Sequence, residues 1–136
     1  MGDDVSRRRT LVTGIVALAV LASAPGAEAA SFVAHLKAPG HHPKAGKRWP
    51  IKVTAKTRSG RPVRARASYQ FVYQGQVVAT RYPFKRTSPY PFRGSYRDGT
   101  FVWPARAAGF KLTLRVVVAT TKRGTRKLDY WVRVRK

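Results

Sequence analysis

Acidic residues and cysteine are what this chain most lacks. Five Asp and Glu stand against 28 Lys and Arg in 136 residues, and cysteine does not occur. The missing cysteine excludes disulfide bonds, thiolate metal sites and a thiol nucleophile. A single methionine also excludes a copper site built from clustered thioethers. A domain without disulfide bonds must be held together by its hydrophobic core alone.

The charge imbalance sharpens once residues 1–29 are set aside as a removable segment. That segment holds three cations, Arg7 to Arg9, and three acids. About 107 residues remain, with 25 basic and two acidic side chains, so the net charge is still +23. Surface charge is normally mixed in sign, because charge of one sign repels itself and destabilises the compact state. We interpret the excess as the mark of an anionic partner.

Residues 1–29 have the pattern of a signal peptide. Arg7–Arg9 form a positive region, and Leu11–Ala22 form an apolar run. Ala27-Glu28-Ala29 then gives the small-x-small pattern that signal peptidase accepts, so we expect cleavage before Ala30. The mature protein is therefore expected to be secreted or associated with the cell envelope.

Two alternatives bear on this segment. A membrane anchor would need about 20 apolar residues, and Pro25 and Gly26 break the run before that length. We therefore expect no transmembrane span in the mature chain. The stretch Ser6–Leu11 resembles the twin-arginine export motif, although Thr10 stands where that motif has Phe. General secretory and twin-arginine export both remain open.

The mature chain is long enough for one domain with one core. Residues 30–47 are expected to be an N-terminal segment or linker, with a possible first strand at Ser31–Leu36 and a loop at Lys37–Lys47. Residues 48–136 show short alternating runs, separated about every ten residues by Gly, Pro and Ser. This pattern predicts an all-β antiparallel sandwich of about seven strands.

The expected buried faces follow from the alternation, because side chains on a strand point to opposite sides in turn. We expect turns at Gln74-Gly75, at Asp98-Gly99 and at Lys122–Thr125, and a mostly irregular stretch at Pro83–Gly94. The predicted core residues are Trp49, Ile51, Val53, Ala55, Val63, Ala65, Ala67, Tyr69, Phe71, Tyr73, Phe101, Trp103, Phe110, Leu112, Leu114, Val116, Val118, Leu128, Tyr130, Val132 and Val134.

A family resemblance rests on three short stretches. Gly60–Ala67 resembles the G-x-P-V-x-x-A-x opening of many bacterial immunoglobulin-like modules. Phe92–Tyr96 fits the aromatic-x-Gly-x-aromatic step of that group, and Trp103-Pro104 precedes a closing pair of valine-rich strands. The resemblance covers roughly Trp49–Arg135 and implies an immunoglobulin-like sandwich, without the cysteine pair of antibody domains. It implies no catalytic residue, since such modules serve adhesion, spacing and ligand binding alike.

A polyanion-binding surface is the leading site hypothesis. The runs that begin near Val63, Phe110 and Leu128 are expected to be neighbours in one sheet. Their outward side chains would form a flat basic grid, and the planar guanidinium of Arg binds oxyanions in a bidentate manner. An aromatic residue among arginines also suits a polyanion surface. The predicted site residues are Arg64, Arg66, Lys111, Arg115, Trp131, Arg133 and Arg135.

Other chemistries have weaker support. His41-His42, with His35 nearby, lacks the further ligands that a copper or zinc site needs. We predict no metal and no cofactor. Asp98 is explained by its Asp-Gly turn, and Asp129 by an ion pair with Arg133 on the same face, so no pair of catalytic carboxylates is expected. No nucleophile elbow or phosphate-binding glycine loop is present, which argues against an enzyme.

The function expected from the sequence is electrostatic binding of an anionic envelope polymer or of anionic lipid headgroups. A structural or adhesion module that docks to a partner protein is the alternative, and extracellular nucleic-acid binding is the third. Nucleic acid inside the cell is an unlikely partner for an exported chain. The Pro- and aromatic-rich segment 82–97 is expected to be either a binding loop or a flap that covers a sheet edge.

Overall fold

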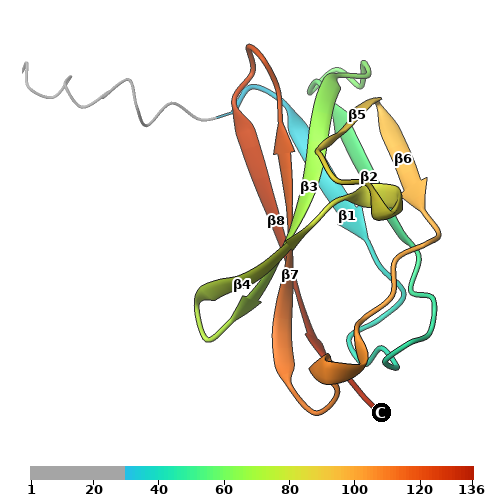
Figure 1. Ribbon diagram of the computed structural model, residues 1–136. Coiled ribbons are helices and arrows are strands. Elements are labelled where there is room, and N and C mark those ends of the chain that lie inside the picture. Colours follow the sequence, from blue (N-terminus) through green and yellow to red (C-terminus); the bar gives the residue numbers. More distant parts are fainter. Residues whose placement is uncertain (1–29) are drawn as a thin grey trace, which may run out of the picture.

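Residues 30–136 are described by the computed structural model, and they form an all-β fold with two antiparallel sheets (Figure 1). One sheet has the order β1-β2-β6; the other has the order β4-β3-β7-β8, with β5 also paired to β3. The predicted signal peptide lies outside the described residues. The strands are β1 (Val33–Lys37), β2 (Ile51–Lys56), β3 (Arg64–Tyr73), β4 (Gln76–Arg81), β5 (Tyr90–Arg93), β6 (Ser95–Asp98), β7 (Lys111–Ala119) and β8 (Thr125–Arg133).

The core lies between the two sheets and follows the predicted alternation. Ile51 and Val53 of β2 are fully buried, as are Leu114 and Val116 of β7. Each such side chain stabilises the fold by about 1.5–3 kcal/mol through removal of apolar surface from water. The intervening residues of β2 and β7 are more exposed, which confirms that each strand has one buried and one wet face.

The N-terminal segment packs against the larger sheet along the free edge of β8. The backbone N–H of Arg133 donates to the carbonyl of His41 (2.7 Å), and that of Arg135 donates to the carbonyl of Pro43 (2.8 Å). Ala45 donates in turn to the carbonyl of Arg135 (2.8 Å). These bonds satisfy edge groups that would otherwise be open to a further strand. Within residues 30–136, no helix has the length and apolarity that a membrane crossing requires.

The stretch Pro83–Gly94 was expected to be mostly irregular, but it contains β5, and β6 follows directly; the structure has eight strands in residues 30–136. β5 pairs with the first half of β3 and covers that part of its edge. Pro91 is tolerated there since β5 is an edge strand that need not donate on its outer side. Tyr90, Phe92 and Tyr96 supply the apolar contacts that order the segment, with ring centroids 4.8 to 6.5 Å apart.

Two further expectations are corrected near the ends of the sheets. Phe110 was predicted to be in the core, but it is 46% exposed and packs edge-on against Tyr73. Phe110 directly precedes β7 and lines an open apolar groove together with Val78, so its side chain stays in contact with solvent. The run Thr100–Trp103, whose alternation after the Asp98-Gly99 turn predicts a further short strand, forms only one isolated bridge, between Arg48 and Val102.

Candidate polyanion-binding site

The outer face of the five-stranded sheet carries the residues predicted to bind a polyanion. β7 pairs with β3 on one side and with β8 on the other, so the three predicted runs are neighbours. Their inner residues form the core, and the alternate residues therefore point to solvent. The sequence does not reveal the register in which these strands pair, and the register determines which outward side chains lie opposite one another.

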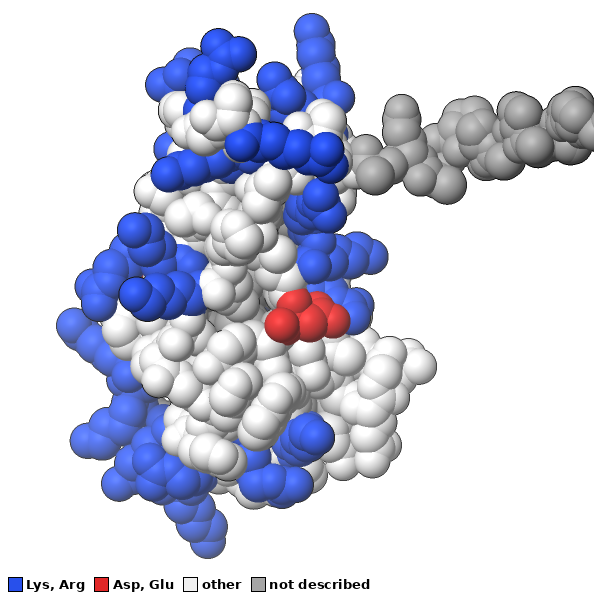
Figure 2. Space-filling view, turned by 180° about the vertical axis from the view of Figure 1, so that it is seen from behind, with Lys and Arg blue, Asp and Glu red and all other residues white. Residues whose placement is uncertain are grey.

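The register divides the predicted residues into two groups at opposite ends of the sheet. Arg66 lies opposite Ala119, near the end of β7, whereas Lys111 lies opposite Arg133, at the start of β7. Between these ends, Ser68 lies opposite Val117, Val117 lies opposite the exposed cation Lys127, and Gln70 lies opposite Arg115. The expected continuous grid is therefore two cationic clusters at the ends of the sheet, with Lys127 and Arg115 between them. Figure 2 shows one face of the molecule, on which many of the blue side chains lie toward the edges and one red acidic group lies nearer the middle.

Arg115 lies between the clusters and is paired with an acid. Its Nε donates to one carboxylate oxygen of Asp129 (2.8 Å), and a terminal nitrogen donates to the other (3.1 Å). These hydrogen bonds raise the pKa of Arg115 above its ordinary value. The ion pair predicted for Asp129 thus exists, but its partner is Arg115, which lies directly opposite across the β7–β8 ladder, rather than Arg133.

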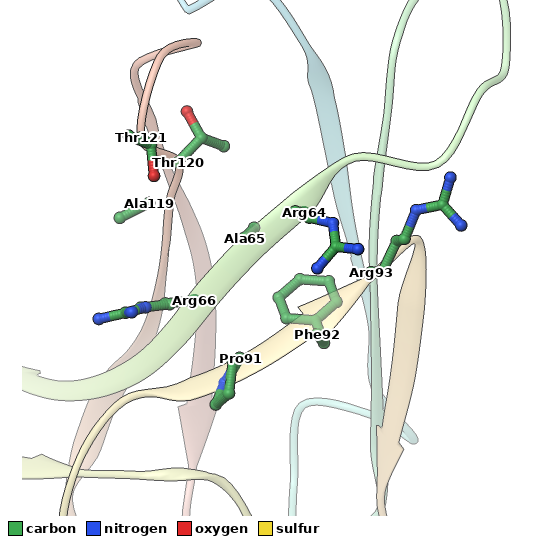
Figure 3. A pocket seen from close by; sticks show the side chains of 9 residues that line it. All are labelled: Arg64, Ala65, Arg66, Pro91, Phe92, Arg93, Ala119, Thr120 and Thr121. Carbon is green, nitrogen blue, oxygen red and sulfur yellow. The ribbon is translucent and has the colours of Figure 1, made fainter.

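The first cluster surrounds an open hollow of about 680 Å³ where β3 begins (Figure 3). Arg64 and Arg66 come from β3, and Arg93 comes from β5. Arg64 and Arg93 are directly opposite each other in the β3–β5 ladder. Figure 3 shows Arg64 beside the ring of Phe92 and Arg93 extending away from that ring, while Arg66 extends toward the β7 side. The rest of the lining is Ala65, Pro91, Phe92, Ala119, Thr120 and Thr121, with no acidic side chain.

Arg93 is the member of this hollow that sequence reasoning missed. The three prolines at residues 83–91 predict irregular structure, and this prediction hides the strand pattern in which Tyr90 and Phe92 point to one side and Arg93 to the other. The sequence did hold one sign of a strand here, because Phe92 and Arg93 begin the aromatic-x-Gly-x-aromatic step. The opposing position of Arg64 follows only from the pairing of β5 with β3.

The second cluster combines Lys111, Arg133 and Trp131. Lys111 and Arg133 are opposite each other, and the ammonium of Lys111 lies 5.4 Å from the centre of the Trp131 ring. That distance is within the range of a cation–π contact. Trp131 is 43% exposed, as the alternation predicted for an outward residue. Arg135 lies beyond the end of β8, where its Nε donates to the carbonyl of His42 (3.0 Å).

The histidines support the second cluster structurally. The His41 ring stacks on Tyr130 and on Trp131, with centroids 4.2 and 4.1 Å away. Its Nδ1 donates to the carbonyl oxygen of Trp131 (2.6 Å), so that nitrogen is already used. Among residues 30–136, no three His, Asp or Glu side chains gather as metal ligands would.

Asp98 is a buried carboxylate with its acceptor sites filled. One oxygen accepts from the Tyr69 hydroxyl (3.0 Å) and from the Phe84 N–H (3.1 Å). The other accepts from the N–H and hydroxyl of Thr100 (2.9 and 2.7 Å). The turn bonding predicted for Asp98 is present in the contacts with Thr100. The contacts with Tyr69 and Phe84 give this residue a structural role that joins distant segments.

Comparison of the chain with protein-family models, with curated protein sequences and with solved structures returned no match. The class of the protein is therefore defined by its own fold, an all-β protein of two antiparallel sheets with three and five strands. Its distinguishing feature is a set of exposed cations that lie opposite one another without acidic partners in the described chain.

Proposed function

We propose that the protein is an exported, non-enzymatic module that binds anionic polymers of the cell envelope through the hollow formed by Arg64, Arg66 and Arg93. The observation that carries the proposal is the direct opposition of Arg64 and Arg93. Like charges directly opposite across a ladder destabilise a sheet, and here no acid lines the hollow to offset them. A bound phosphate, sulfate or carboxylate would supply the missing countercharge and could accept from both guanidinium groups.

The immunoglobulin-like part of the proposal is supported by the strand order. In that fold one sheet contains A, B and E, and the other contains C, F and G. The order β1-β2-β6 and the order β3-β7-β8 match those sets when the strands are taken in chain sequence. β4 then extends the second sheet beside β3. Ligands of such modules bind to a rigid surface rather than in a catalytic cleft, which suits a binding role.

The envelope is the expected place of action because residues 1–29 have the pattern of a signal peptide. Teichoic-type polyphosphate, acidic glycan and anionic lipid headgroups are the ligands of suitable charge. All of them repeat an anion along a chain or surface, and the exposed cations of both clusters could engage more than one repeat. Extracellular nucleic acid has the same backbone chemistry, and competition between polymers distinguishes it from the envelope ligands.

The proposal is tested by the triple variant R64Q/R66Q/R93Q on heparin and phosphocellulose with a salt gradient. We expect earlier elution and a log–log salt slope that falls by about 0.9 for each phosphate that the variant no longer neutralises. The matched control K47Q/R48Q/R106Q removes the same charge from exposed positions away from the hollow. Equal effects of the two variants would mean that diffuse charge binds the polymer, and would overturn the role of the hollow.

Competition then identifies the polymer class. Long-chain polyphosphate, an acidic glycan, anionic vesicles and duplex DNA are each added to heparin-bound protein. Displacement by the first three at equal charge supports an envelope ligand. Displacement by DNA alone would favour the nucleic-acid alternative.

A second candidate function is docking of an extended, uncharged segment of a partner protein along β4. Residues 67–80, which contain most of the β3–β4 hairpin, carry no charge, and the hairpin extends away from the other strands (Figure 1). Val78 is 58% exposed and, with Phe110, lines an apolar groove of about 330 Å³. Fractionation of cells separates the two candidates. If the protein docks to a partner along β4, V78K should release it from the envelope fraction, whereas the control T80K should not. If it binds an anionic polymer, R64Q/R66Q/R93Q should release it instead.

A further inference from the structure

The outer face of the three-stranded sheet carries a cationic row that sequence reasoning did not identify. Lys37 of β1 lies directly opposite Lys52 of β2, and Lys52 lies directly opposite Arg97 of β6. All three side chains are exposed. Side chains directly opposite on neighbouring strands have Cβ atoms about 4.5–5.5 Å apart. Lys52 therefore has a like charge on each side at close range.

The rest of this face offers no countercharge. The adjacent row consists of His35, Thr54 and Ser95, which are polar but not acidic. Lys56, two residues beyond Thr54, adds another exposed cation to the same face. The two acids of the described chain lie elsewhere, since Asp98 is buried and Asp129 is paired with Arg115 on the other sheet.

The geometry suits a linear anion that crosses the strands. Neighbouring strands are about 4.8 Å apart, so the row of three cations extends over about 10 Å. A polymer lying along the row would meet a cation at each strand. The polar row beside it could donate hydrogen bonds to the same chain.

This row and the hollow face in opposite directions. The inner face of β2 and the inner face of β7 both belong to the core, so their outer faces point away from each other. Stacked sheets are about 10 Å apart, and the outward side chains add to that thickness. One short stretch of polymer cannot reach both surfaces.

We propose that Lys37, Lys52 and Arg97 form a second anion-binding surface, so that one molecule bridges two polymer strands. This inference rests on the proposed function and adds a role for it, the cross-linking of anionic polymer. Binding requires only one surface, whereas bridging requires both. The two properties can therefore be measured separately.

A sandwich assay tests the inference. Protein is loaded on immobilised heparin, and soluble fluorescent heparin is then added. The wild type should capture the labelled chains. K37Q/K52Q/R97Q should load to at least half the wild-type level but capture at least fivefold less label, because the cationic row on one of its two faces has been removed. The control K47Q/R48Q/R106Q should capture label at nearly the wild-type level.

The outcomes separate the two proposals. A wild type that does not load on heparin at low salt overturns the proposed function itself. Loading with equal capture by K37Q/K52Q/R97Q and the control overturns the second surface alone. Folding is checked by thermal unfolding of K52Q. Its midpoint should equal or exceed that of the wild type, since the substitution removes a charge placed between two like charges, and a lower midpoint would contradict the repulsive row.

Discussion

Asp98 is the residue on which the polar interior depends. It is 1% exposed and accepts four hydrogen bonds from three residues. The Tyr96 hydroxyl donates to that of Tyr69 (3.2 Å) and extends the network. Burial raises the pKa of Tyr69 and of Tyr96 above the ordinary value of 10.0, and the negative charge of Asp98 raises both further. Both phenols therefore remain protonated in the folded protein at pH values where free tyrosine ionises.

This shift predicts a loss of stability at alkaline pH. Below about pH 10 the folded and unfolded states hold these protons alike. Above it the unfolded chain releases them while the folded protein retains them, so the free energy of unfolding should fall by up to about 1.4 kcal/mol per pH unit for each tyrosine. Urea unfolding from pH 9 to 11.5 measures the slope. Y69F/Y96F should be less stable at neutral pH but should show a shallower decline, and an equal decline would contradict the assignment.

Asp129 limits the charge at the centre of the larger sheet, because it is the partner of Arg115. Its side chain is 49% exposed, and exposed ion pairs contribute about 0–1 kcal/mol. We expect D129N to change stability by less than about 1 kcal/mol while freeing Arg115 for an external anion. The variant should elute from heparin at higher salt than the wild type. Elution of D129N/R115Q should return to the wild-type position or below it, whereas an unchanged D129N would show that Arg115 lies outside the binding surface.

At the scale of elements, the passage from β5 to β6 joins the two sheets. Gly94 lies between these strands, where its N–H donates to the carbonyl of Val63 (3.0 Å) and its carbonyl accepts from Ala55 (2.8 Å). Its φ of +82° is in the region that favours glycine, and an added Cβ would meet the Cβ of Pro62 at 3.0 Å. The corner that places Arg93 in one sheet and Arg97 in the other therefore depends on this residue.

Substitution at this corner should destabilise the fold more than a comparable substitution elsewhere. We expect G94A to lower the free energy of unfolding by about 2–3 kcal/mol, from backbone strain and the contact with Pro62. Gly60 also has a positive φ of 91°, but an added Cβ has no neighbour within 4 Å. G60A should therefore cost about 1 kcal/mol. Chemical denaturation compares them, and equal effects would show that steric contact at the corner is unimportant.

At the scale of the whole molecule, the charge of +23 opposes the compact state. Few of the 25 cations have an acidic partner, since Arg115 with Asp129 is the one ion pair found within residues 30–136. The remaining repulsion acts over a Debye length of about 8 Å at physiological ionic strength. The fold tolerates this because its apolar core is continuous between the sheets.

Salt should therefore stabilise the protein. Raising NaCl from about 0.02 to about 0.5 M shortens the screening length from over 20 Å to under 5 Å, and we expect the thermal midpoint to rise by several degrees. Heparin at low salt should raise it further, because a ligand that binds the folded state stabilises it. K37Q/K52Q/R97Q should respond less to NaCl than the wild type. A midpoint that is independent of salt would contradict the repulsive character of the surface.

Much of the fold could be predicted from alternation alone. Ile51 and Val53 on β2, and Leu114 and Val116 on β7, were expected to be buried and are. The exception at Phe110 arises because burial also needs a covering layer, and Phe110 instead lines an open groove. β5 could not be recognised, since its one proline, Pro91, removes a backbone donor and its alternation covers only four residues.

The candidate site was only partly accessible from the sequence. The outward positions of Arg64, Lys111 and Trp131 followed from the pattern, but the separation of the first from the other two did not. The pairing of Arg115 with Asp129 and the opposition of Arg64 and Arg93 depend on register between strands distant in the sequence. Register is set by bulges, turns and core packing together, and no short motif encodes it.

The amino-acid sequence by itself determined the net charge, the absence of disulfide cross-links and most of the side chains that face water. These properties are local or additive, because each follows from composition or from the two-residue period of a strand. The tertiary structure alone decided which exposed cations lie together. Lys37, Lys52 and Arg97 are dispersed over 61 positions of the sequence, and they form one row because β2 pairs with β1 on one side and with β6 on the other.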